Sequence, residues 1–199
     1  MWHRAIIMVL FVGLAACGDT DSTDPDPGYT PPDITGSWQT PCFPTKPGEF
    51  VRLDGEFAAD SWSVTVNVAN DDQCAMPGLV LRTDGGAYTF TGESEGVAGA
   101  HEATFPFTKK TITAFAPPLV DALNGAMCGD APWEAGVPQD VSDGCEAFGQ
   151  HAISECPEDF DLIALVDGEL SHGLRPADND MCSKSKRPAS LDPVPFARQ

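Results

Sequence analysis

The chain has 199 residues and a formal net charge of −19, because 30 Asp and Glu residues outnumber 11 Lys and Arg residues. This balance excludes nucleic acid as a partner, since phosphate binding requires a basic face. It also disfavours direct adhesion to anionic lipid headgroups. Such acidity is typical of proteins that stay soluble in an extracytoplasmic compartment.

The first sixteen residues have the layout of a secretory signal peptide. His3 and Arg4 precede an apolar run over residues 5–14, and small residues follow that run. The run is shorter than the roughly 20 apolar residues that a transmembrane helix needs. We therefore expect residues 1–16 to be cleaved rather than retained.

Cys17 is the expected site of lipid attachment. The segment Leu14-Ala15-Ala16-Cys17 resembles the bacterial lipobox, in which a peptidase cuts before a cysteine whose sulfur carries diacylglycerol. The alternative is an ordinary secreted protein that keeps Cys17 as a structural residue. Two or three acyl chains, at about 0.8 kcal/mol per buried CH₂, would give stable membrane attachment. We expect an anchor in the bacterial cell envelope, in the outer rather than the inner membrane, with the protein periplasmic or surface-exposed.

Residues 17–33 are predicted to form an acidic tether. They are rich in Pro and Asp and contain almost no apolar side chains, so burial cannot offset the entropy of ordering them. Closely spaced Asp residues over 19–26 could suggest calcium, but they lack the order of a calcium loop and its Glu at the twelfth position. We expect a single folded domain to follow over residues 34–199.

Six cysteines remain once Cys17 is assigned to lipid, an even number that suits an oxidising compartment. Six cysteines allow fifteen pairings, and we expect the sequential one. Its disulfides are Cys42–Cys74, Cys128–Cys145 and Cys156–Cys182. Zinc is the competing use, but the chain has no C-x-x-C pair and its histidines at 101, 151 and 172 are scattered. We therefore expect no metal and no other cofactor.

The first half of the domain alternates apolar and polar residues with period two, which predicts strands. The clearest run covers 62–68, and similar runs cover 51–57, 88–90 and 105–107. Turn signals separate the runs. They are Ala58-Ala59-Asp60, Asp71-Asp72, Asp84-Gly85-Gly86 and Lys109-Lys110. This spacing predicts an antiparallel meander with one apolar face.

The second half is less regular. Prolines at 117 and 118 open an apolar stretch that stops near Gly125, which predicts a short helix. An apolar strand then begins near Phe160, and the turn signal Asp167-Gly168 precedes a return strand. Together these elements predict a mostly β fold that closes into a lipocalin-like barrel or a strongly curved sheet, with one short helix and disulfide-bonded loops.

Ser94 lies in a motif that is found in hydrolases. Gly92-Glu93-Ser94-Glu95-Gly96 matches G-x-S-x-G, the nucleophile elbow of esterases and lipases. That elbow requires a helix after the serine, whereas the following residues predict another strand. The two neighbouring Glu residues also disfavour a developing oxyanion. We expect a plain turn and no enzyme, and keep a hydrolase that uses Ser94 as the third alternative.

Seven segments of the domain follow one another in a recognisable order. They are ITGSWQTPC, PGEFVRLDGEF, DQCAMPGLVLRTDGG, GVAGAHEATFPF, APW, FDLIAL and KRPASLDP. With Cys42, Cys74, Cys128 and Cys145 in matching places, this order resembles the adenomatosis polyposis coli down-regulated 1 domain family over residues 34–195. Animal members are membrane-attached antagonists of Wnt signalling, built of β-barrel modules with an apolar pocket for a lipid. The resemblance implies a single such module with an N-terminal lipid anchor.

The departures from that family limit what the resemblance implies. Animal members hold two modules and a C-terminal membrane helix, whereas this chain shows one module and the polar ending PVPFARQ. Phe43 also stands where the family usually has an acidic residue. A bacterial-type anchor implies a cell without Wnt ligands. We therefore expect a lipid-sized pocket to be shared, but not the signalling role.

The segment Gly36-Ser37-Trp38 matches the G-x-W signature of lipocalins, small barrels that carry hydrophobic ligands. In those barrels an Arg from the last strand packs on the Trp, and Arg187 is the candidate here. A cation–π contact of this kind contributes about 0.5 to 2 kcal/mol. The resemblance implies that Trp38 and Arg187 pack together at one end of the barrel, in a structural role.

Five apolar residues are the candidates for an interior pocket, although a packed core would have the same composition. They are Trp62, Val64, Val66, Phe105 and Phe107. Our first hypothesis is an anchored protein that binds a lipid, an acyl chain or another hydrophobic ligand. The second is an envelope or surface module that contacts a protein or glycan partner through its loops, with a filled core. A cavity larger than a few waters would favour the first, and a filled interior would exclude it.

Overall fold

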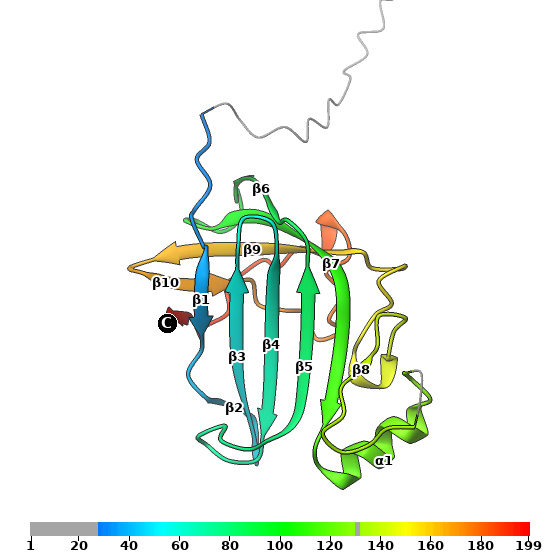
Figure 1. Ribbon diagram of the computed structural model, residues 1–199. Helices are drawn as coiled ribbons and strands as arrows, with labels where there is room; N and C mark the ends of the chain where they lie inside the picture. Colours follow the sequence, from blue (N-terminus) through cyan, green and yellow to red (C-terminus); the bar gives the residue numbers. More distant parts are fainter. Residues whose placement is uncertain (1–27, 130–131) are drawn as a thin grey trace, which may run out of the picture.

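The computed structural model, which describes residues 28–129 and 132–199, is mostly β and consists of antiparallel strands with one α-helix (Figure 1). The strands are β1 (Gly36–Gln39), β2 (Phe43–Lys46), β3 (Glu49–Phe57), β4 (Trp62–Ala69), β5 (Pro77–Gly85), β6 (Thr89–Glu93), β7 (His101–Ala114), β8 (Gln139–Asp140), β9 (Glu158–Val166), β10 (Glu169–His172) and β11 (Phe196–Arg198). The helices are α1 (Pro117–Ala126) and the 3₁₀ turns η1 (Glu146–Phe148) and η2 (Lys184–Lys186). The predicted signal peptide, Cys17 and most of the predicted tether lie outside the described residues.

Hydrogen bonding between the strands is ring-like. Pairing runs from β3 through β4, β5, β7, β9, β10 and β11 to β1, and β1 pairs with β3 again. In Figure 1, β3, β4, β5 and β7 lie side by side, and β9 with β10 crosses behind them at one end. Strands β2, β6 and β8 pair outside this ring. The predicted mostly β meander with strong curvature is confirmed.

Aromatic side chains on the inner face form the main core cluster. The Trp62 and Phe105 rings meet edge to face with their centroids 5.3 Å apart, and Phe57 packs 6.2 Å from Phe105. Ile34 is fully buried in the same cluster. Upstream of it, the Tyr29 hydroxyl lies 3.0 Å from Nδ1 of His101.

All three predicted disulfides are confirmed. Cys42 bonds to Cys74, Cys128 to Cys145, and Cys156 to Cys182, with sequence separations of 32, 17 and 26. Closing loops of this size stabilises a fold by about 3 kcal/mol each, chiefly through the unfolded state. The disulfides hold the long connections that strand pairing does not.

The predicted helix and hairpin are also confirmed. Pro117 occupies the first turn of α1, where its missing N–H costs nothing, and Met127 ends the helix in the left-handed region with φ 55°. Asp167 and Gly168 have φ 54° and 84°, as a two-residue turn between β9 and β10 requires. The described part of the chain contains no helix with the length and hydrophobicity of a membrane span.

The turn predicted at Lys109-Lys110 is wrong, because β7 continues through both residues. A bulge instead leaves Thr108 unpaired, since Asp84 pairs with Lys109 and Gly85 with Phe107. An extra residue in one strand reverses the side on which the following side chains lie. The inward positions therefore change from Phe105 and Phe107 to Lys110 and Ile112.

The predicted contact between Trp38 and Arg187 is also wrong. Trp38 is buried and donates from Nε1 to the Ile34 carbonyl at 2.8 Å, but the guanidinium over its ring, at 4.4 Å, belongs to Arg198. The reason is the short C-terminal strand β11, which was not predicted and whose register places Arg198 opposite Trp38. Arg187 lies over Phe160 instead and pairs with Glu102 at 2.7 Å.

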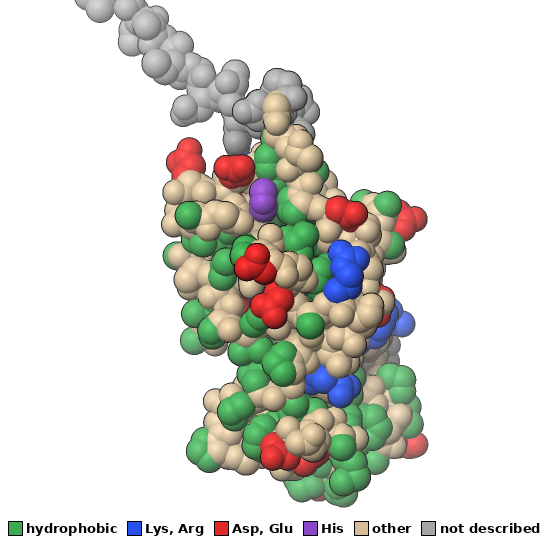
Figure 2. Space-filling view, turned by 90° about the vertical axis from the view of Figure 1, so that its left-hand side faces the viewer, with side chains coloured by type: hydrophobic (Ala, Val, Ile, Leu, Met, Phe, Trp, Pro, Cys, Tyr) green, Lys and Arg blue, Asp and Glu red, His purple; other side chains and the backbone are tan. Residues whose placement is uncertain are grey.

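Lys and Arg side chains are dispersed on the face in Figure 2. Acidic side chains are scattered over the same face, and apolar side chains gather at its lower end. The face shown therefore carries no continuous basic patch.

The fit of Gly85 against Trp62 gives a test of the fold. A Cβ at Gly85 would overlap the Trp62 indole and the Pro106 carbonyl, to which the indole N–H donates at 3.2 Å. We expect Gly85→Ala to lower the free energy of unfolding by about 2 to 3 kcal/mol, as overpacked cores do. Urea denaturation would measure this change.

Gly86 is the matched control, because a Cβ there would meet nothing within 4 Å. Gly86→Ala should change the free energy of unfolding by less than about 0.5 kcal/mol. Equal stability of the two variants would contradict the packing described for Trp62.

Candidate ligand-binding cavity

A cavity of about 450 Å³ lies inside the ring of strands, within the range of about 300 to 1,000 Å³ that is usual for small-molecule sites. All five residues predicted for an apolar pocket line it: Trp62, Val64, Val66, Phe105 and Phe107. Its other apolar side chains are Leu53, Phe57, Leu81, Phe148, Ile163, Leu170 and Phe196. The interior is thus hollow, and most of its wall is apolar.

The strand side chains along this wall are incompletely buried although they point inward. Val64 and Val66 on β4, Leu53 on β3 and Leu81 on β5 are all half-buried and all line the cavity. A packed core would cover such side chains with other side chains. Their remaining apolar surface therefore faces the empty space and is available to a ligand.

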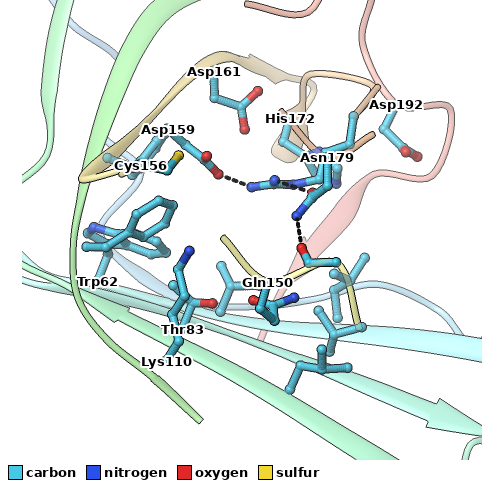
Figure 3. Close-up of a pocket in the computed structure, with 18 of the residues that line it drawn as sticks. Trp62, Thr83, Lys110, Gln150, Cys156, Asp159, Asp161, His172, Asn179 and Asp192 are labelled. Atoms are coloured by element: carbon cyan, nitrogen blue, oxygen red, sulfur yellow. Dashed lines mark hydrogen bonds and ion pairs between the residues drawn. The ribbon is translucent and has the colours of Figure 1, made fainter. Parts of the chain in front are cut away.

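A chain of polar contacts lies opposite that wall (Figure 3). Arg175 pairs with Asp159 on β9, and its Nη1 donates to Oδ1 of Asn179 at 2.8 Å. Asn179 then donates from Nδ2 to the Gly149 carbonyl at 2.9 Å. These contacts join the segment after β10 to the segment after η1 across the cavity.

Lys110 on β7 reaches into the cavity from the strand side. Its side chain points between Trp62 and Gln150 in Figure 3, and the residue is only 6% exposed. The ammonium donates to the His151 carbonyl at 3.0 Å and lies 4.2 Å from the centroid of the Phe107 ring. Burial lowers the pKa of Lys110 below its ordinary 10.5, and the charge of Asp159 partly opposes this change.

Asp161 on β9 is a buried carboxyl at the same cavity. Its Oδ1 accepts hydrogen bonds from the backbone N–H groups of Leu162 at 2.7 Å and Gly173 at 3.0 Å. Desolvation raises the pKa of Asp161 above its ordinary 3.8, and this effect exceeds the opposing charges of His172 and Arg175. Folding therefore shifts the ionisation of Asp161 to higher pH.

The three histidines are not brought together. His172 lines the cavity, and its Nδ1 lies 2.8 Å from the Gly173 carbonyl, which can only accept, so Nδ1 carries the proton. His151 also lines the cavity, but its Nε2 is buried without a hydrogen-bond partner, and His101 contacts Tyr29. Within residues 28–129 and 132–199, no group of three His, Cys, Asp or Glu side chains could hold a metal ion.

Ser94 lies in the turn between β6 and β7. Its hydroxyl accepts a hydrogen bond from the Val97 N–H at 3.2 Å, and its own N–H donates to the Ala100 carbonyl at 2.8 Å. The chain then enters β7 without a helix, so the geometry of a nucleophile elbow is absent at Ser94. Ser94 is not among the residues that line the cavity.

Sequence reasoning found the apolar wall but missed the polar groups. Alternation along 62–68 and 105–107 identified the wall, whereas Lys110 was assigned to a turn. Asp159 and Asp161 lie on β9, in a segment interpreted only as a hydrophobic strand. The alternation of Asp159 and Asp161 with Phe160 and Leu162 was the available signal, because both Asp residues share one face.

Comparisons with known proteins add no assignment to this geometry. No model of a protein family matches the chain, and no curated protein matches it.

The buried carboxyl of Asp161 predicts a dependence of stability on pH. Because its pKa is higher in the folded protein than in the unfolded one, the folded state binds more protons, and its ionisation destabilises the fold as pH rises above about 4. Asp161→Asn retains an acceptor oxygen for the two N–H groups and cannot ionise. We expect the free energy of unfolding of the parent to fall relative to that of this variant as pH rises from about 4 toward neutrality.

Urea denaturation of both proteins across that pH range would measure the difference. Asp60→Asn, in the exposed turn after β3, is the control for removing a carboxylate. A difference in the free energy of unfolding between the parent and Asp161→Asn that stays constant with pH would contradict the raised pKa of Asp161.

Proposed function

We propose that this protein is a membrane-anchored extracytoplasmic lipoprotein that binds a lipid or another hydrophobic ligand inside its ring of strands. The carrying observation is the cavity of about 450 Å³, equal to roughly fifteen water molecules at about 30 Å³ each. A filled interior would have removed the basis for this proposal. The ligand site is the apolar wall formed by β3, β4, β5 and β7.

Transfer of apolar surface out of water supplies the driving force for such binding. Each Å² of apolar surface that leaves water contributes about 25 cal/mol. A ligand that covers the half-buried Val64, Val66 and Leu53 would remove their apolar surface from water as well as its own, and both surfaces would contribute to the free energy of binding. Because their strands belong to a hydrogen-bonded ring, little conformational entropy is lost when the ligand enters.

The envelope location is supported by two features of the chain. Three disulfides suit an oxidising compartment outside the cytoplasm. The lipobox-like segment ending at Cys17 supplies the proposed anchor, although it lies outside the described residues. In Figure 1 the first described residues leave the ring beside β1, at the end where β6 lies. A tether from that end would separate the cavity from the lipid surface.

Membership of the adenomatosis polyposis coli down-regulated 1 domain family stays a prediction, and its expected lipid pocket agrees with this proposal. A surface interaction module remains the second candidate function. Met127, 91% exposed after α1, and Met76, 79% exposed before β5, favour it, because exposed methionines suit contacts with adaptable partners.

Filling the cavity with a larger side chain should weaken ligand binding. Val66→Trp adds an indole to the apolar wall, so dodecanol should bind at least about tenfold more weakly, a loss of 1.4 kcal/mol or more. Native mass spectrometry of the protein with added dodecanol would measure bound and free fractions. The same spectra of protein extracted in mild detergent would reveal any co-purified lipid.

Thr65→Trp is the matched control, because Thr65 lies on the opposite face of the same strand, within 3.5 Å of Arg82. This variant should bind dodecanol like the parent. Failure of the parent to bind dodecanol or any co-purified lipid would contradict the proposed function.

Lipid attachment at Cys17 gives a separate prediction. Cys17→Ser removes the sulfur that would carry the diacylglycerol, so the variant should lose the N-terminal acyl mass and leave the membrane fraction. Cell fractionation and intact-mass measurement would follow both changes. Retention of the serine variant in the membrane would contradict the assignment of Cys17 as the anchor.

A further inference from the structure

The cavity separates apolar from polar side chains. Apolar residues on β3, β4 and β5 supply one wall, whereas the polar side chains come mainly from β9, from the loop after η1 and from the segment after β10. Figure 3 shows these polar groups meeting at one side of the space. A molecule that fills both regions must therefore be an amphiphile rather than a plain hydrocarbon.

In the part of the chain that the structure describes, two cations line the cavity, and Lys110 is the one without an ionic partner, since Arg175 pairs with Asp159. Among the described residues, its Nζ hydrogen-bonds only to the His151 carbonyl and makes no ion pair within 4.0 Å. An ammonium has three donors, so it can donate further hydrogen bonds beside the one to His151. A buried ammonium without a counterion is costly, because desolvation disfavours its charge.

The acidic groups that line the same cavity are engaged elsewhere. Asp159 pairs with Arg175, and Asp161 accepts two backbone N–H groups. Asp192 accepts from the Val194 N–H at 2.9 Å. Arg175 is in turn occupied by Asp159 and Asn179. Of the two described cations that line the cavity, Lys110 is thus the one without a carboxylate partner, and an anionic ligand group would supply it.

We infer that the ligand is a long-chain carboxylic acid in its ionised form, with its chain against the apolar wall and its carboxylate on the Lys110 ammonium. This inference rests on the proposed function, because it names the ligand class of the same cavity. A carboxylate supplies two acceptor oxygens, and charge-assisted hydrogen bonds are roughly twice as strong as neutral ones. The Phe107 ring lies beside Nζ, with its centroid 4.2 Å away.

The bulge at Thr108 is what makes Lys110 available. Without it, strict alternation from Phe107 would place Lys109 inside and Lys110 in solvent. Lys109 is instead exposed and lies 3.8 Å from Asp140. Two adjacent lysines therefore differ in one respect that a binding experiment can use: Lys110 faces the cavity and Lys109 faces solvent.

Three probes with one chain length test the inference: dodecanoic acid, dodecanol and dodecylamine, each titrated into the full-length protein and followed by native mass spectrometry. We expect the parent to bind the acid at least about tenfold more tightly than the alcohol, as hydrogen bonds to a charged group require. Lys110→Met should reduce that preference to less than about threefold while still binding the alcohol, and Lys109→Met should retain it. Binding of the alcohol by Lys110→Met also shows that this variant is folded.

The outcomes separate this inference from the proposed function. If the acid and the alcohol bind equally, or if dodecylamine binds most tightly, the carboxylate inference is overturned and a hydrophobic ligand site remains. If the parent binds none of the three probes, the proposed function fails together with it. An acid preference that survives in Lys110→Met would also overturn the role of Lys110.

Discussion

Closure of the hydrogen-bonded ring through the four residues of β1 is the constraint on which the rest of this structure depends. Because β1 pairs with both β3 and β11, the inward faces of eight strands surround one space. Trp38 secures this closure: its indole donates to the Ile34 carbonyl, and Arg198 of β11 covers its ring. A break at β1 would open the ring and expose the cavity wall.

The cavity stays open because hydrogen bonds between the strands hold its wall in place. Aromatic rings at one end pack against each other, with Trp62 held by Pro106 and by the absence of a side chain at Gly85. Collapse would require the strands to approach, and their pairing on both sides prevents it.

Sequence reasoning succeeded where local chemistry decides the outcome. The alternation over 62–68, the Asp167-Gly168 turn and the prolines in the first turn of α1 each identify their element without distant partners. The apolar pocket residues followed from the same alternation. The sequential disulfides were anticipated, but that choice was one of fifteen that spacing alone allows.

The features that sequence reasoning missed depend on pairing between distant segments. Arg198 covers Trp38 because β11 pairs with β1. The two residues are 160 positions apart in the chain, so no local sequence pattern predicts their contact. Lys110 faces the cavity because the partner strand β5 skips Thr108. A bulge of one residue leaves composition unchanged and reverses every later side chain, so alternation alone assigns Lys110 to the wrong face.

The hydrogen bond from Asn179 to the Gly149 carbonyl joins two loops at the cavity and takes no part in the pairing of the strands. This hydrogen bond is exposed, and an exposed polar contact contributes only about 1 kcal/mol. Its two loops are anchored nearby by Cys128–Cys145 and Cys156–Cys182, so they can part without unravelling. Loss of this hydrogen bond would therefore leave the pairing of the strands intact, because the loop contact and the ring of strands depend on different bonds.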